Sequence, residues 1–226
     1  MRYLQPSEVK RLFLLLILSD FALILVHLLH KLTVYYLKSN ELFLYNPLFA
    51  IETDLGLAES FQYVKEFWIV LMLCALARRH AQLSYLSWGS LFFYILLDDA
   101  GQIHERLGRW ISSYFHFRSL LGLGTDDMGQ LSVYAAIGLL FLFLLVPALL
   151  HGDKNFRNFS LQLGLIFTAL TFCGAGIDAI YIANQPLWVR GLTTLLEEGG
   201  EMIVMSVAVA YLFGTLSLTT IRGNTE

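Results

Sequence analysis

The sequence is poor in charge, in cysteine and in the motifs of nucleotide chemistry. Charged residues make up 15% of its 226 residues and the formal net charge is −3, so no nucleic-acid-binding surface is expected. The two cysteines, Cys74 and Cys173, lie in apolar segments and give no basis for a disulfide framework. There is no Gly-rich phosphate loop, Gly-x-Ser-x-Gly elbow or Cys-x-x-Cys pair, which argues against nucleotide-dependent and serine-based catalysis.

Histidine and internal repeats are scarce as well. The six histidines are too few and too scattered for the dense histidine sets of membrane desaturases or of intramembrane ceramidase-like hydrolases. We find neither a tandem repeat nor an inverted repeat. The sequence therefore lacks a common signature of secondary transporters.

Long apolar runs are what the chain has in abundance. Hydrophobic residues make up 57% of the sequence, and the mean hydropathy is +0.62. A helix of roughly 20 apolar residues crosses a bilayer, and only helices satisfy their own backbone there. We therefore predict an all-α transmembrane bundle of about six spans, forming one integral membrane domain over residues 1–226. The predicted spans are 12–37, 58–77, 83–114, 128–150, 156–183 and 189–218.

The basic residues give the predicted bundle an orientation. Six spans place both termini on one side, and a small excess of Lys and Arg at the span ends favours the cytoplasm for that side. The first run follows Arg2, Lys10 and Arg11 and has no small-residue cleavage site, which indicates a retained signal anchor. We expect a multi-pass protein of the bacterial inner membrane.

Two connections are longer than the others. Residues 38–57 contain Asn46-Pro47, a turn signal, and are expected to form either an interfacial helix or a partial cap over the bundle. Residues 115–127 are predicted to be a loop. We expect its paired Asp126 and Asp127 to cap the fourth span.

Acidic side chains gather in one half of the predicted membrane. They fall late in spans that run outward and early in spans that run inward, and within each span they share one helical face. A charge at the bilayer centre costs about 2.5–3.5 kcal/mol on the lenient insertion scale, so bound cations, protons or water must compensate. These carboxylates are Glu59, Glu66, Asp98, Asp99, Glu105, Asp178, Glu197, Glu198 and Glu201.

A metal site is one interpretation of this cluster. Carboxylates and imidazoles on facing helices build di-iron and di-manganese centres, although His104 and Glu105 are adjacent here and do not follow the usual Glu-x-x-His spacing. The metal would be iron, manganese or zinc. It would activate water against a lipid ester, amide or phosphoester, or activate oxygen for a lipid-like substrate, with Glu105, Glu201 and Asp99 as catalytic candidates. The predicted ligands are Asp98, Asp99, His104, Glu105, Glu198, Glu201 and Asp178, supported by Glu59, Tyr63, Glu66, His27 and Glu197.

Two other functions remain open. Carboxylates and histidines at one depth could relay protons or bind the cation of a channel or transporter, although Asp20 is the only acidic residue well inside the other half. The polar stripes could instead join helices in a structural subunit of a membrane complex. The expected partners are the lipid bilayer and either a lipid substrate or another membrane subunit, with no nucleic acid and no nucleotide.

Three short motifs carry a resemblance. They are Phe61-Gln62-Tyr63-Val64-Lys65-Glu66, then Asp98-Asp99 followed by His104-Glu105, and Glu197-Glu198-Gly199-Gly200-Glu201-Met202. In these the chain resembles a group of uncharacterised bacterial multi-pass membrane proteins. The resemblance covers most of the chain and implies the helical membrane fold and the choice of site. It implies no activity.

Overall fold

The structure is a computed structural model, and it describes residues 6–37, 42–118, 124–177 and 186–222. Every regular element within these residues is helical, so the predicted all-α fold is confirmed. The chain divides into two compact units. Unit 1 comprises residues 1–72 and 159–226, and unit 2 comprises residues 73–158. The boundaries fall within helices α2 (Leu57–Arg79) and α6 (Lys154–Thr171).

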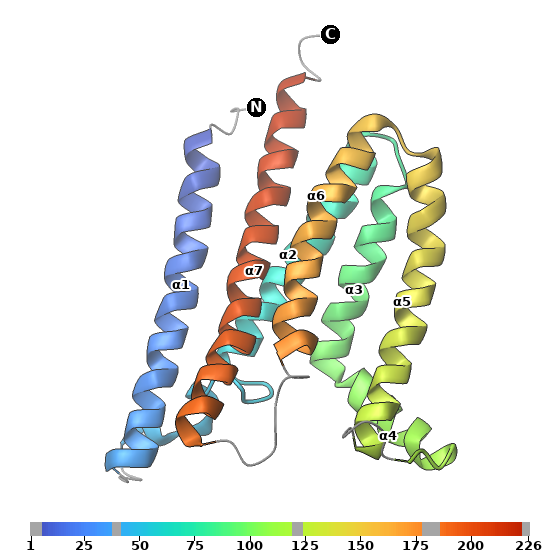
Figure 1. Cartoon of the computed structure of the whole chain (residues 1–226). Coiled ribbons are helices and arrows are strands. Elements are labelled where there is room, and N and C mark those ends of the chain that lie inside the picture. Colours follow the sequence, from blue (N-terminus) through green and yellow to red (C-terminus); the bar gives the residue numbers. More distant parts are fainter. Residues whose placement is uncertain (1–5, 38–41, 119–123, 178–185, 223–226) are drawn as a thin grey trace. The chain divides into compact units, whose positions relative to one another are not determined.

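Two long helices form the frame of unit 1. Helix α1 (Pro6–Leu32), which continues as a π-helical turn (Thr33–Leu37), lies beside helix α7 (Leu187–Arg222) (Figure 1). A Cβ on Gly199 would lie 3.3 Å from Ile24, and one on Gly214 would lie 3.5 Å from Val9. Because residues early in α1 meet residues late in α7, the two helices are antiparallel. The absence of a side chain at Gly199 lets them approach closely.

The connection between α1 and α2 folds back onto unit 1. Two short 3-10 turns, Phe43–Tyr45 and Pro47–Phe49, lie against α1. Ile51, which follows them, is buried with Ala58 of α2 and Met202 of α7. The described residues of this connection form short turns and not one interfacial helix, and the expected partial cap over the bundle stays a prediction.

Unit 2 is built on α5 (Thr125–His151), which packs against α3 (Tyr85–Gly101) and more extensively against α4 (Ile103–Tyr114) (Figure 1). The start of α5 is capped as predicted, because Asp127 accepts a 2.8 Å hydrogen bond from the backbone N–H of Gly124. Asp126 instead accepts a 3.1 Å hydrogen bond from the Ser112 hydroxyl of α4.

The third predicted span is not one helix, which corrects the prediction of a continuous helix from 83 to 114. Helix α3 ends at Gly101, and Gln102 adopts a left-handed conformation with φ of 51°. The Asp98 carboxylate accepts a 2.7 Å hydrogen bond from the backbone N–H of His104 in the first turn of α4. Asp98 thus caps a new helix, and this bond offsets the cost of about 1–2 kcal/mol for a left-handed residue other than glycine.

Four helices in the described residues are long and apolar enough to cross a membrane. They are Ser7–Leu37, Leu57–Arg79, Thr125–His151 and Trp188–Ser217, close to four of the six predicted spans. Helix α3, with 17 residues, is not among these four. Helix α6 has 18 residues and continues as a π-helical turn, Phe172–Gly176, and residues 178–183 of the predicted fifth span lie outside the described residues.

Candidate functional site

A buried ion pair joins three helices in unit 1. The Lys65 ammonium of α2 donates to Asp20 of α1 at 3.0 Å and to the Met202 carbonyl of α7 at 2.9 Å. The Ser206 hydroxyl of α7 donates to the second oxygen of Asp20. Asp20, Lys65 and Ser206 each have 0% exposed surface. We call these three residues the ion-pair centre.

Sequence reasoning missed the ion-pair centre. It gave Lys65 no role and named Asp20 only as the one acidic residue well inside the other half of the membrane. The signal was one acid in the middle of an apolar α1 and one lysine among the polar residues in the first half of α2. Two opposite charges that are each expensive alone are best explained by pairing with each other.

His27 and His30 hold the connection 42–56 onto α1. The backbone N–H of Ile51 donates to Nδ1 of His27 at 3.2 Å, and Nδ1 of His30 lies 2.7 Å from the Leu44 carbonyl, which it reaches as a donor. Both imidazoles are buried. In the contact with Ile51, Nδ1 of His27 acts as the acceptor. In these contacts both histidines act as hydrogen-bonding residues.

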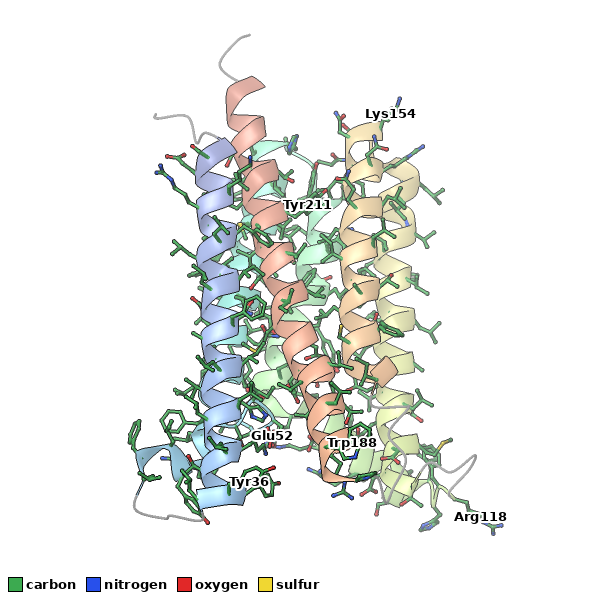
Figure 2. The ribbon with its side chains drawn as sticks, turned by 60° about the vertical axis from the view of Figure 1, so that its left-hand side comes forward. Tyr36, Glu52, Arg118, Lys154, Trp188 and Tyr211 are labelled. Atoms are coloured by element: carbon green, nitrogen blue, oxygen red, sulfur yellow. The ribbon has the colours of Figure 1, made fainter. Side chains whose placement is uncertain are left out.

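Glu52 brings charge to the same end of α1. Figure 2 shows Glu52 and Tyr36 at this same end. The Glu52 carboxylate pairs with Lys31 and lies 3.3 Å from His27 Nδ1. Burial alone would raise the pKa of the Glu52 carboxyl. The hydrogen bond from Lys31 and the charge of Lys31 outweigh burial, so the pKa lies below its usual value.

The acidic residues of α7 lie in the field of other acids from unit 1. The charges that act on Glu198 are those of Glu197 and Glu201 in α7, Glu52 in the connection and Glu59 in α2. Like charges repel one another, so protons, cations or water must offset the repulsion. We call these five residues the acidic cluster.

Local backbone features fix two members of the acidic cluster. Glu59 accepts a hydrogen bond from the backbone N–H of Leu55 and so caps the start of α2. A Cβ on Gly174 would lie 2.1 Å from a carboxylate oxygen of Glu201, so the absence of a side chain in the π-helical turn makes room for that carboxylate. π-helical turns are frequent at functional sites.

The candidate residues of unit 2 make pairs among themselves. Nδ1 of His104 lies 3.0 Å from the second oxygen of Asp98, and the His104 ring stacks on Tyr134 of α5 with centroids 5.0 Å apart. The hydrogen bond from His104 to Asp98 raises the pKa of the His104 imidazole despite partial burial. Glu105 accepts a 3.2 Å hydrogen bond from Arg109 one turn later.

The described side chains do not assemble the predicted metal-ligand set. Within residues 6–37, 42–118, 124–177 and 186–222, no three His, Cys, Asp or Glu side chains converge as metal ligands. Glu198 and Glu201 belong to unit 1, and Asp178 lies outside the described residues. A metal centre shared by the whole set stays a prediction, and Asp98, Asp99, His104 and Glu105 are the part of it that lies in unit 2.

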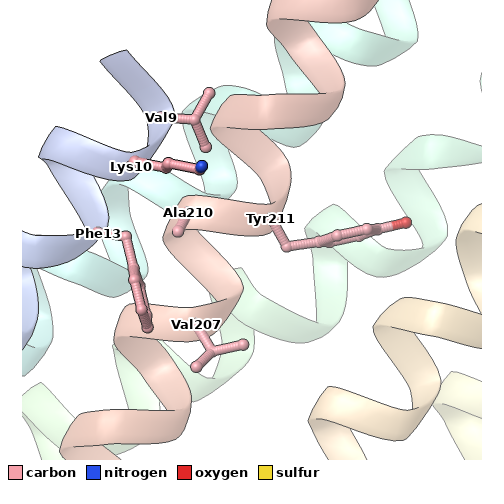
Figure 3. A pocket seen from close by; sticks show the side chains of 6 residues that line it. All are labelled: Val9, Lys10, Phe13, Val207, Ala210 and Tyr211. Carbon is pink, nitrogen blue, oxygen red and sulfur yellow. The ribbon is translucent and has the colours of Figure 1, made fainter. Parts of the chain in front are cut away.

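The other supporting residues all lie in unit 1. Glu66, on the same face of α2 as Glu59, is fully buried, and Tyr63 is partly buried. A shallow groove of about 330 Å³ lies between the first turns of α1 and the second half of α7 (Figure 3). It does not include any member of the acidic cluster. The side chains that line it are Val9, Lys10, Phe13, Val207, Ala210 and Tyr211.

Comparison with known proteins gives a family without an activity. No curated protein and no solved structure is significantly similar to the chain. A family model described as a domain of unknown function, DUF8692, matches residues 12–215 and so covers most of the chain, from α1 to α7. The chain therefore belongs to the DUF8692 family.

Proposed function

We propose that the protein is a multi-pass protein of the bacterial inner membrane, in which the ion-pair centre is the protonatable site of a proton- or cation-coupled channel or transporter. The observation that carries this proposal is the complete burial of Lys65 and Asp20 on helices of membrane-spanning length. The antiparallel α1 and α7, both of membrane-spanning length, also support the prediction that the two termini lie on one side of the membrane.

A purely structural reason for this ion pair is weak. Replacing a buried ion pair by apolar residues of similar volume is often neutral or stabilising, so stability alone does not require the charges. Ionisable residues at membrane depth are instead typical of ion pathways and proton relays. A proton or cation that reaches Asp20 would weaken its attraction for Lys65. The ion-pair centre would thereby couple occupancy to the packing of α1, α2 and α7.

Polar residues connect this centre to one end of unit 1. Glu59, Gln62 and Glu66 follow one face of α2, with Lys65 beside them. Among the described atoms, the buried Oε1 of Gln62 accepts no hydrogen bond. It would accept one from a water molecule that takes part in proton transfer. Past the centre, Leu16, Val209 and Leu212 are buried and apolar. We infer that the site is reached from the acidic cluster and is blocked on its other side at rest.

The test is proton movement in vesicles. The purified protein would be reconstituted with a trapped pH-sensitive dye, and a pH gradient would be applied with and without a membrane potential. We expect proton flux above that of empty vesicles and its loss in Asp20→Asn. Lys10→Gln, which removes an exposed lysine from the same helix, is the matched control and keeps the flux.

Two outcomes would overturn the proposal. If the flux equals that of empty vesicles under either driving force, with sodium or potassium present, the protein is not a channel or transporter of this kind. Flux that persists in a folded Asp20→Asn variant would remove the ion-pair centre from the pathway. The ion pair would then be left with the structural role.

A second candidate is a metal-dependent enzyme acting on a lipid-like substrate. The observation that favours it is that the charges of acids in α2, α7 and the connection 42–56 act on Glu198. The described side chains would have to move closer together to act as metal ligands. Elemental analysis of the purified protein beside a Glu198→Ala/Glu201→Ala variant tests it. Stoichiometric iron, manganese or zinc that is lost in the variant supports this candidate, and no metal after loading with each ion rejects it.

A further inference from the structure

Helix α4 is held against α5 in a fixed orientation. A Cβ on Gly129 of α5 would lie 2.1 Å from the Gly108 carbonyl oxygen of α4, so the two backbones are in direct contact. Ser112 donates to Asp126, and His104 stacks on Tyr134. Gly108 and Ser112 are buried. One face of α4 therefore packs on α5, and this packing determines which face of α4 points outward.

The outward face is aromatic along one stripe and basic along the next. Leu107, Trp110 and Tyr114 recur at helical spacing, and the last two are 59% and 66% exposed and stacked on each other. Arg106 and Arg109 are exposed on the adjoining stripe. Figure 2 shows Arg118, just beyond α4, projecting outward. Glu105 pairs with Arg109, and the three arginines still leave this face with a positive excess.

The place of α4 along the chain fits the edge of a bilayer. It lies against the first turns of α5, a helix of membrane-spanning length. Tryptophan and tyrosine are favoured at the level of lipid headgroups, and arginines beside an apolar stripe reach phosphate while their stems stay in the apolar region. The positive excess favours an anionic headgroup over a zwitterionic one.

We propose that α4 is an interfacial helix that binds the headgroups of anionic phospholipids through Arg106, Arg109 and Arg118, while Leu107, Trp110 and Tyr114 enter the boundary of the acyl chains. The sequence alone had assigned this segment to the third membrane span. This inference does not depend on the ion-pair centre, because every residue it uses lies in unit 2.

Quenching of Trp110 by brominated lipid tests the proposal. The full chain would be placed in phosphatidylcholine vesicles that contain a fixed fraction of lipid brominated near the headgroup, either phosphatidylglycerol or phosphatidylcholine. The difference between the wild type and Trp110→Phe isolates the signal of Trp110 and leaves the other tryptophans in place. We expect brominated phosphatidylglycerol to quench Trp110 at least about twofold more than brominated phosphatidylcholine.

Variants of the basic residues decide what causes that preference. We expect Arg106→Gln/Arg118→Gln to bring the two quenching values together, as should high salt. Arg78→Gln, which removes an exposed arginine at the end of α2, is the matched control and keeps the preference. Equal quenching by both lipids in the wild type would overturn the anionic preference. Quenching by aqueous acrylamide alone would overturn the interfacial position of α4.

Discussion

In unit 1 the ion pair of Lys65 with Asp20 has no exposed surface, whereas in unit 2 the side chains of Arg109 and Glu105 remain 51% and 35% exposed. Both are Lys or Arg salt bridges to a carboxylate at about 3 Å, so geometry alone does not distinguish them. Burial does, because water screens the exposed pair and cannot screen the buried one. Breaking the buried pair is therefore expected to lower the free energy of unfolding by about an order of magnitude more than breaking the exposed pair.

The largest effect is expected from Lys65→Met. This change leaves the Asp20 carboxylate buried without its cation, so the free energy of unfolding should fall by about 3–5 kcal/mol. It would be measured by reversible unfolding in mixed micelles. Lys10→Met, at an exposed position of α1, is the control and should change it by less than about 0.5 kcal/mol.

The double variant Asp20→Asn/Lys65→Met makes the comparison sharper. It removes both charges and keeps an oxygen to accept the hydrogen bond from Ser206. We expect it to recover most of the stability lost in Lys65→Met. A double variant as unstable as the single one would mean that the lysine stem, and not its charge, supports the packing of α1, α2 and α7.

The next effect concerns backbone contact in unit 2. In Gly129→Ala the new Cβ would meet the Gly108 carbonyl oxygen at 2.1 Å, so α4 must shift and the free energy of unfolding should fall by about 1–3 kcal/mol. Gly138→Ala, in the same helix but with no atom within 4 Å of the new Cβ, is the control and should stabilise by up to about 1 kcal/mol. Equal effects of the two substitutions would contradict the close packing of α4 on α5.

The third effect depends on pH. Folding raises the pKa of His104 through its hydrogen bond with Asp98. This contribution to stability is therefore fully present below the pKa of the unfolded chain and is lost as the pH rises through the folded pKa. Asp98→Asn should remove about 1 kcal/mol at about pH 5.5 and less at about pH 8.5. A loss that is the same at both pH values would show that Asp98 acts only as the cap of α4.

Apolar length predicted much of the fold. The runs that contain α1, α2, α5 and α7 are visible because a bilayer-crossing helix needs about 20 apolar residues and has no other way to satisfy its backbone. The break at Gln102 does not show in apolar length, and its one local signal is Gly101 just before it, a residue that weakens a helix. What makes the break is the Asp98 carboxylate reaching His104, a bond specified by three-dimensional position.

Residues of the candidate site could be singled out from the sequence, but most of their contacts could not. Depth and helical face led us to group Glu59 with the acids of α7, and the charges of Glu59, Glu197 and Glu201 do act on Glu198 in unit 1, but a common site for them stays a prediction. The partner of Lys65 could not be found that way, because Asp20 lies 45 positions earlier and the lysine stem spans the gap between helices. His27 and His30 bind backbone atoms of the connection 42–56. Such partners cannot be recognised in the sequence, because nearly every residue type has the same backbone groups.

The smallest effect is expected at Glu105, one of the catalytic candidates chosen from the sequence. Its described partner is Arg109, one turn away on a half-exposed stripe, and such pairs contribute about 0.3–0.5 kcal/mol. Glu105→Gln should therefore change the free energy of unfolding by no more than that and leave proton flux in vesicles intact. Arg109→Gln should match it, since the two changes remove the same contact. A loss in Glu105→Gln that Arg109→Gln does not share would give this carboxylate a second role, and the metal site predicted from the sequence is the role it would then support.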